Sequence, residues 1–155
     1  MTVHIVTDSS CDLTDAEIEA HGIDVVPLSI RFGEDAHLDR DELSVDDFYR
    51  KMAASDELPQ TAAPSPGAFA QIFRQRLDEG ADAVVCLNLS QRVSATMESA
   101  ELGAREVEGD VRVVDSRSVT AGLGVMVMAA SRAAADGASA DEVVALVEDL
   151  RGRTR

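Results

Sequence analysis

Apolar positions along the chain alternate between short continuous runs and longer stretches with helical spacing. The apolar run at residues 83–89 is typical of a strand buried on both faces, as in a parallel sheet, and residues 3–7 and 111–114 predict two further strands. Residues 23–30 are also rich in β-forming side chains, but Pro27 removes a backbone donor from this run. We therefore predict three strands and one edge or irregular strand.

Apolar side chains recur with a helical period in the remaining segments, several of which open with a capping residue. Thr14 with Glu17 three residues later, Ser44, Ser65 and Ser139 are start signals of this kind. The spacing predicts helices over residues 16–21, 45–54, 66–80, about 95–106 and 119–135, and a last helix after residue 139. Residues 32–35 predict a turn, and the proline-rich residues 55–66 predict an extended or irregular backbone.

The alternation of strands and helices predicts an α/β fold with three layers, in which a mostly parallel sheet is covered by helices on both faces. The 155 residues suffice for one domain with a substantial core. The chain closes with a basic segment at residues 151–155, where we expect a linker to a second domain. We therefore expect residues 1–155 to form one domain, either as a fragment of a longer protein or as a half-protein.

Composition and charge exclude several classes of function. The formal net charge is -15, which repels phosphate backbones, so we expect no nucleic-acid binding. No apolar run is long enough to span a bilayer, so we expect no stable membrane insertion. Asp8 and Asp12 come too early for a secretory leader, which favours the cytoplasm. Cys11 and Cys86 do not form a disulfide framework, and the carboxylates beside Cys11 should oppose thiolate formation.

The candidate chemistry lies where the run at residues 83–89 ends. Ser90 and Ser94 follow this predicted strand and precede a predicted helix. Open α/β sheets bind ligands at the carboxyl ends of their strands, and a helix N-terminus attracts an anion. The strands at 3–7 and 111–114 also end in loops of small and hydroxyl residues, and the three loops converge if their strands are neighbours. The alternative interpretation is that these serines only cap a turn and a helix.

Five segments carry motifs in a fixed order over nearly the whole chain. They are residues 6–13 (VTDSSCDL), 46–49 (DDFY), 61–69 (TAAPSPGAF), 89–96 (LSQRVSAT) and 114–122 (VDSRSVTAG). They resemble the TDSxxDL, EEFY, TSxPSxxxF, SSxLSGT and VDSxxxSxG signatures of the DegV family. Each motif alone is weak, whereas the series of five is specific.

The resemblance implies a FakB-type protein that binds a long-chain fatty acid and presents it to a separate fatty-acid kinase for acyl-phosphate formation. It implies that hydroxyl groups hold the fatty-acid carboxylate, that the chain itself catalyses nothing and uses no cofactor or metal, and that a second domain covers the acyl tail. The residues that match the family's carboxylate-binding positions are Thr61 and Ser94. Possible supporting residues in the same loops are Asp8, Ser9, Ser65, Ala95 and Thr96.

Two positions depart from the family pattern. Ala95 stands where the SGT element has glycine, and Ala62 stands where the TSxPS loop has its first serine. Only glycine adopts positive φ freely, so the loop at Ala95 is shifted if the family backbone needs positive φ there.

Two enzyme classes could be built on the same loops. A small serine hydrolase would need a histidine beside Ser94, but none is near it in sequence and the spacing of a nucleophile elbow is absent. A metal-dependent phosphatase could hold Mg²⁺ at Asp8 or Asp12, although an aspartate followed by hydroxyl residues is also ordinary turn chemistry. A further alternative is a regulatory or structural protein that keeps the scaffold without the ligand.

Overall fold

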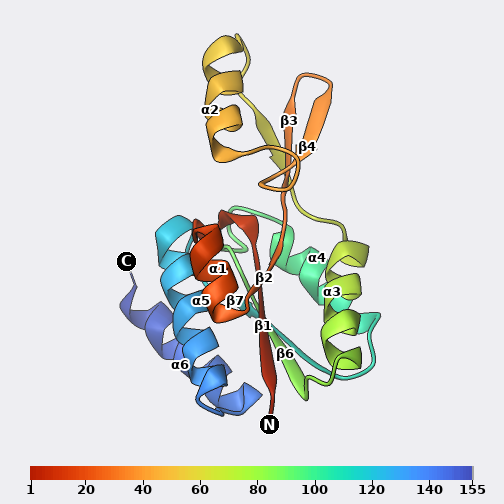
Figure 1. The fold of residues 1–155 in the computed structure, drawn as a ribbon, viewed down its shortest axis with the longest axis vertical. Helices are drawn as coiled ribbons and strands as arrows, with labels where there is room; N and C mark the ends of the chain where they lie inside the picture. Colours follow the sequence, from red (N-terminus) through yellow and green to blue (C-terminus); the bar gives the residue numbers. More distant parts are fainter. Residues whose placement is uncertain (155) are drawn as a thin grey trace.

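The computed structural model describes residues 1–154 and has a four-stranded parallel sheet at its centre (Figure 1). The strand order is β2 (Asp24–Val26), β1 (Val3–Asp8), β6 (Ala83–Asn88) and β7 (Asp110–Asp115). Every pair of neighbouring strands is parallel. The central strand β6 is buried along its whole length, which is why its sequence is apolar without alternation. The predicted parallel sheet is confirmed.

Helices cover both faces of this sheet, which confirms the predicted three layers (Figure 1). Successive strand residues face opposite sides, so Ile5 belongs to the core beneath α5 and α6, and Val6 belongs to the core beneath α3 and α4. Among residues 1–154, no helix combines the length and apolar character that crossing a bilayer requires. The helices of one face are α1 (Asp15–His21), α5 (Thr120–Ala135) and α6 (Ala140–Arg153), and those of the other are α3 (Pro66–Asp78) and α4 (Thr96–Arg105).

The predicted capping residues begin their helices as expected. The Thr14 side chain accepts a hydrogen bond from the backbone N–H of Glu17, whose carboxylate accepts one from the backbone N–H of Thr14. Ser139 makes the same reciprocal cap at α6. Ser65 accepts a hydrogen bond from the backbone N–H of Ala68, 3.2 Å away, at the start of α3. These caps satisfy N–H groups that have no partner within the helix.

Pro27 divides the predicted strand at residues 23–30 between two sheets. The edge strand β2 ends at Val26, and after Pro27 and Leu28 the chain enters a second, antiparallel sheet. The sequence did not predict this sheet, and it assigned an irregular backbone to residues 55–66, part of which forms a strand. The strands of the second sheet, in the order β4-β3-β5, are β4 (Asp35–Leu38), β3 (Ser29–Phe32) and β5 (Gln60–Ala62).

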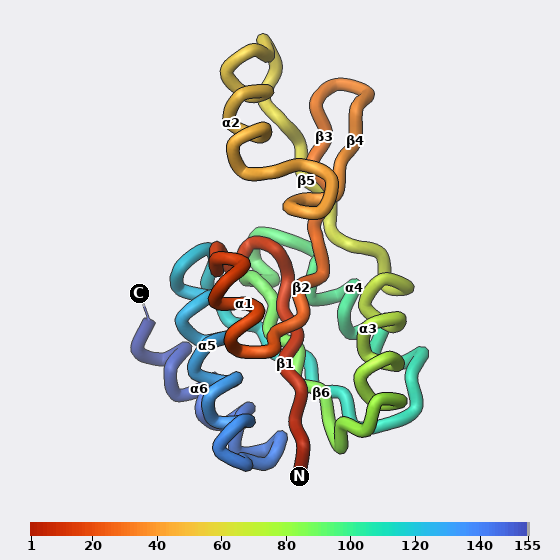
Figure 2. Tube along the Cα trace, in the orientation of Figure 1, coloured from red at the N-terminus to blue at the C-terminus, as the bar shows by residue number. Residues whose placement is uncertain are grey.

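Residues 29–62, called the lobe below, project from the rest of the molecule, the body (Figures 1 and 2). The lobe comprises the small sheet and α2 (Val45–Ala54). The ring centroids of Phe32 on β3 and Phe48 on α2 are 5.9 Å apart, so an aromatic contact joins the helix to the sheet. The lobe stands beyond the carboxyl-terminal ends of the parallel strands, which places it next to the predicted site.

Candidate functional site

Three loops meet at the carboxyl-terminal edge of the parallel sheet, as predicted, because β1, β6 and β7 are neighbours. The backbone N–H of Leu89 donates a hydrogen bond to Asp8 Oδ2 at 2.9 Å and joins the loops after β6 and β1. The backbone N–H of Ser90 donates to the carbonyl of Ser118 at 2.8 Å and joins the loops after β6 and β7. This edge is therefore one connected structure.

Asp8 is the buried centre of this edge. Its Oδ1 accepts hydrogen bonds from the backbone N–H and hydroxyl of Ser10, at 3.1 and 2.5 Å. Its Oδ2 accepts from the Asn88 side chain at 3.2 Å and from the backbone N–H of Leu89. Since both carboxylate oxygens are occupied by protein donors, the Asp8 side chain braces the loops. In residues 1–154, no three side chains of the types His, Cys, Asp and Glu gather as potential metal ligands.

Asn88 and Asp115 are site residues that the sequence analysis did not single out. Asp115 Oδ1 accepts hydrogen bonds from the backbone N–H groups of Gln91 and Arg117, at 3.2 and 2.9 Å, and so fixes the loops after β6 and β7 together. Both residues are buried polar side chains at the last position of an apolar strand. Their position at the strand ends could have identified them from sequence, because a buried amide or carboxylate there must find hydrogen-bond partners.

Ser94 lies just before α4 with its hydroxyl directed to the helix start. Its Oγ accepts a hydrogen bond from the backbone N–H of Thr96 at 3.2 Å and lies 2.8 Å from Thr96 Oγ1. Ala95 is the N-cap residue and contributes no side-chain cap, so the first turn of α4 keeps N–H groups for another acceptor. Ala95 has φ -82°, a conformation open to any residue, so alanine in place of glycine does not strain the loop.

Thr61 lies in the lobe, where it faces Ile30 in the register of β5 and β3. It is exposed and lines a hollow of about 360 Å³ together with Arg31 and Gln60. Ser94 lines a different hollow of about 430 Å³, with Gln91 and Glu98 among its other walls. The structure therefore joins Ser94 to Thr96 but assigns Thr61 and Ser94 to separate hollows, and no hydrogen bond links them among residues 1–154.

The other predicted supporting residues have local structural contacts. Ser9 lies in the short 3₁₀ helix η1 (Ser9–Cys11), and its Oγ accepts a hydrogen bond from the backbone N–H of Leu28 at 3.0 Å. Ser65 is the N-cap of α3. The Ser90 hydroxyl accepts from the backbone N–H of Arg92 at 3.3 Å, which is the turn-capping role considered from sequence. Ser94 is thus the hydroxyl group best placed to meet a ligand at this edge.

Neither the thiols nor the histidines supply a nucleophilic pair here. Burial raises the pKa of the Cys11 thiol, and Asp8 and Asp12 add to this, as the sequence predicted. Burial also raises the pKa of the Cys86 thiol well above its ordinary value. Across residues 1–154, no serine hydroxyl hydrogen-bonds to a histidine ring, and His4 instead contacts Asp24 at 2.7 Å.

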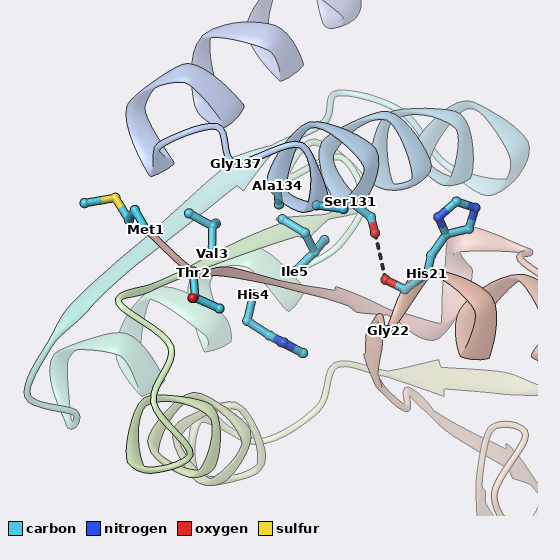
Figure 3. Close-up of a pocket in the computed structure, with 11 residues that line it drawn as sticks. Met1, Thr2, Val3, His4, Ile5, His21, Gly22, Ser131, Ala134 and Gly137 are labelled. Carbon is cyan, nitrogen blue, oxygen red and sulfur yellow. Dashed lines mark hydrogen bonds between the residues drawn. The ribbon is translucent and has the colours of Figure 1, made fainter.

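A further hollow, of about 350 Å³, lies at the opposite, amino-terminal end of the strands (Figure 3). Its walls include Thr2, Ile5 and Gly137, and the Ser131 hydroxyl at its margin donates to the backbone carbonyl of His21 at 2.7 Å. None of the predicted site residues lines it. Its walls combine apolar side chains with a few polar ones, and we assign it no function.

Comparison with known proteins places the sequence in a family. A family model described as "Uncharacterised protein, DegV family" matches residues 2–155. The chain belongs to the DegV family. A DegV domain-containing protein of Clostridium perfringens is 36% identical over 154 residues, which are 99% of this chain and 55% of that protein. This DegV chain thus spans about half the length of the curated relatives it matches.

Solved structures of other DegV proteins share the fold. A Thermus thermophilus DegV family protein described by its fatty-acid binding superposes with a TM-score of 0.89 at 36% identity, over 98% of this chain and 54% of that one. A stearic acid-binding protein from Eubacterium ventriosum superposes with a TM-score of 0.87 at 29% identity, over 94% of this chain and 52% of that one. The DegV fold implied by the sequence motifs is confirmed.

Proposed function

We propose that this chain binds a long-chain fatty acid, with the fatty-acid carboxylate held by Ser94 and Thr61. The arrangement of Ser94 is the observation that carries the proposal. Its Oγ accepts from the Thr96 backbone N–H and shares a hydrogen bond with the Thr96 hydroxyl. When Thr96 donates that bond, the Ser94 proton is free for a carboxylate oxygen.

The start of α4 adds to this donor. A carboxylate next to apolar surface stays charged only if it is hydrogen-bonded. The N-cap residue Ala95 makes no side-chain hydrogen bond to the first turn of α4, Ser94 accepts only the Thr96 N–H of that turn, and the positive end of the helix dipole lies there. Hydroxyl and backbone N–H donors can hold an anion without a buried cation, which suits reversible carriage.

Exposed apolar side chains in the loops at this edge of the sheet offer a path for the acyl chain. Val93 is 70% exposed in the loop after β6, and Val119 is 41% exposed in the loop after β7. Exposed apolar side chains can contact the hydrocarbon tail of a ligand and remove both from water. We propose that the acyl chain leaves Ser94 over these residues and that a second domain covers it.

The wider role follows from the family. Relatives of similar fold are described as fatty-acid-binding proteins, one of them as binding stearic acid. We propose that this chain is a carrier in the cytoplasm, that it presents its fatty acid to a separate kinase, and that the kinase performs phosphoryl transfer. Acyl phosphate should then form only when carrier, fatty acid, ATP and kinase are all present.

Titration with ligands of equal chain length tests the binding proposal. Stearic acid and octadecanol share the hydrocarbon chain and differ at the head group. We expect stearic acid to bind at least about tenfold more tightly, since only the carboxylate gains charge-assisted hydrogen bonds. Equal affinity for both ligands, or no binding of stearic acid, contradicts the proposal.

A further inference from the structure

The lobe does not share a hydrophobic core with the body. The two hydrophobic cores of the body contain no residue between Leu28 and Ala63. Within the lobe, the buried apolar side chains are Ile30 and Leu43. Because no shared core fixes the lobe, its placement depends on the polar contacts at its base.

Those contacts are few among residues 1–154. The backbone N–H of Leu28, at the entry to the lobe, donates to Ser9 Oγ of the body at 3.0 Å. Arg40 Nη2 donates to the carbonyl of Leu13 at 2.5 Å and lies 3.6 Å from Asp15 Oδ1. Arg40 is the one residue of the described lobe whose side chain hydrogen-bonds or ion-pairs with the body.

The Arg40 backbone is shaped to present this side chain. Its φ is 69°, in the left-handed region that favours glycine, and its N–H donates to the carbonyl of Leu43 at 3.0 Å. The guanidinium is largely buried, and Arg40 Nη1 is enclosed without a hydrogen-bond partner. A left-handed arginine with a partly unsatisfied, buried guanidinium is unfavourable by itself, so its contact with Leu13 has to offset this.

The body side of the contact is firmly held. Leu13 is buried, and it follows the loop that Asp8 braces. The same loop packs closely on α5, because a Cβ on Gly124 would lie 2.4 Å from the carbonyl oxygen of Cys11. Arg40 thus connects the lobe to a loop of the body that is held by hydrogen bonds and by close packing on α5.

We propose that Arg40 is a positioning residue that sets the lobe, and with it Thr61, over the carboxyl-terminal edge of the parallel sheet. Thr61 moves with the lobe because β5 pairs with β3, whereas Ser94 belongs to the body. The distance between the two hydroxyl groups therefore depends on the angle of the lobe. The expected effect of Arg40 on ligand binding rests on the proposed function, whereas the placement of the lobe can be measured without a ligand.

Distance measurement by double electron–electron resonance tests the placement. Nitroxide labels on Asp46→Cys in α2 and Arg105→Cys in α4 report the angle, and the native Cys11 and Cys86 are buried. We expect Arg40→Gln to broaden or shift the distance distribution and Arg40→Lys to restore part of it. An Arg40→Gln distribution equal to that of the unsubstituted protein overturns the proposal.

The matched control is Arg50→Gln. Arg50 is also a lobe arginine, but it pairs with Asp47 inside the lobe at 2.6 Å. The Arg50→Gln substitution removes the same charge without changing the contacts between lobe and body, so the distance distribution of this variant should be unchanged. A broadening equal to that of Arg40→Gln would show a nonspecific charge effect and overturn the assignment.

The binding consequence is measured with stearic acid. We expect Arg40→Gln to weaken the binding of stearic acid by about tenfold, because a displaced Thr61 loses its charge-assisted hydrogen bond to the carboxylate. Arg50→Gln should leave the affinity within about twofold of that of the unsubstituted protein. If the unsubstituted chain does not bind stearic acid, the proposed function fails while the distance measurement still decides the role of Arg40. If binding is present and Arg40→Gln leaves it intact, the coupling between lobe and site is wrong.

Discussion

Asp8 Oδ2 accepts a hydrogen bond from the backbone N–H of Leu89 at 2.9 Å, across 81 residues of sequence. The bond joins the ends of β1 and β6, the two central strands of the parallel sheet. Asp8, in the motif at residues 6–13, therefore braces the edge of the sheet where we place the ligand. The polar groups that contact the ligand in our proposal come from the loops around Asp8.

Asp8→Asn should lower the stability of the protein without changing its overall fold. An amide has one acceptor oxygen, so it leaves donors from Ser10 or from Asn88 and Leu89 without a partner. We expect a loss of about 1–3 kcal/mol in the free energy of unfolding, measured by urea denaturation. Asp12→Asn is the control, because Asp12 is exposed with φ 53°, a conformation that asparagine accepts. Equal effects of the two substitutions would contradict the bracing role.

Asp24 should make part of the stability depend on acid pH. Burial raises the pKa of Asp24, but hydrogen bonds from His4 and Arg76 outweigh it and lower the pKa to about 2. A carboxylate with a depressed pKa stabilises the folded state above its unfolded pKa, near 4, and this stabilisation is lost as the pH falls towards 2. The stability difference between the unsubstituted protein and Asp24→Asn should shrink by about 1 kcal/mol as the pH falls from about 5 towards 2, allowing for solvent screening. A difference that stays flat down to the acid limit contradicts this account.

Gly124→Ala should disturb the loop that carries the opening motif. The added Cβ would lie 2.4 Å from the carbonyl oxygen of Cys11, so α5 or the loop must move, and we expect a loss of about 1–3 kcal/mol. Gly152→Ala in α6 is the control, since a Cβ there meets nothing within 4 Å. It should stabilise the helix by about 0.5–1 kcal/mol. Thermal unfolding of both variants distinguishes close packing from helix propensity.

Ala95→Gly tests whether the departure from the family motif harms the loop. Because Ala95 has φ -82°, glycine should gain no favourable conformation and should lower stability by about 0.4–1 kcal/mol through the unfolded chain. Urea denaturation measures the change. A stabilised Ala95→Gly variant would mean that alanine strains the loop.

The parallel sheet and its helices could be predicted from sequence because local patterns determine them. Apolar runs such as β6 are long enough to identify buried strands, and the caps at Thr14 and Ser139 mark helix starts. The small sheet of the lobe could not be predicted, since β3, β4 and β5 have three or four residues each and mostly exposed side chains. Strands this short leave no clear periodic signal, and although β3 and β4 form a local hairpin, β5 joins β3 from a distant segment of the chain.

The candidate site was predictable to a similar extent. The three strand ends were expected to converge and do so, because chain order and parallel pairing place them at one edge. The placement of Thr61 on the lobe depends on contacts such as that between Arg40 and Leu13, which are 27 residues apart. Which hydroxyl groups remain open to a ligand also depends on tertiary hydrogen bonds, as the bond from Leu28 to Ser9 illustrates.

The affinity of Ser94→Ala for stearic acid, measured by isothermal titration calorimetry, tests the central claim most directly. Ser99→Ala in α4 is the matched control, because it removes a half-buried hydroxyl from the helix that follows Ser94. The account predicts that Ser94→Ala binds about 10–100-fold more weakly than the unsubstituted protein and that Ser99→Ala binds equally well. An unchanged affinity of Ser94→Ala would contradict the claim that this hydroxyl holds the fatty-acid carboxylate.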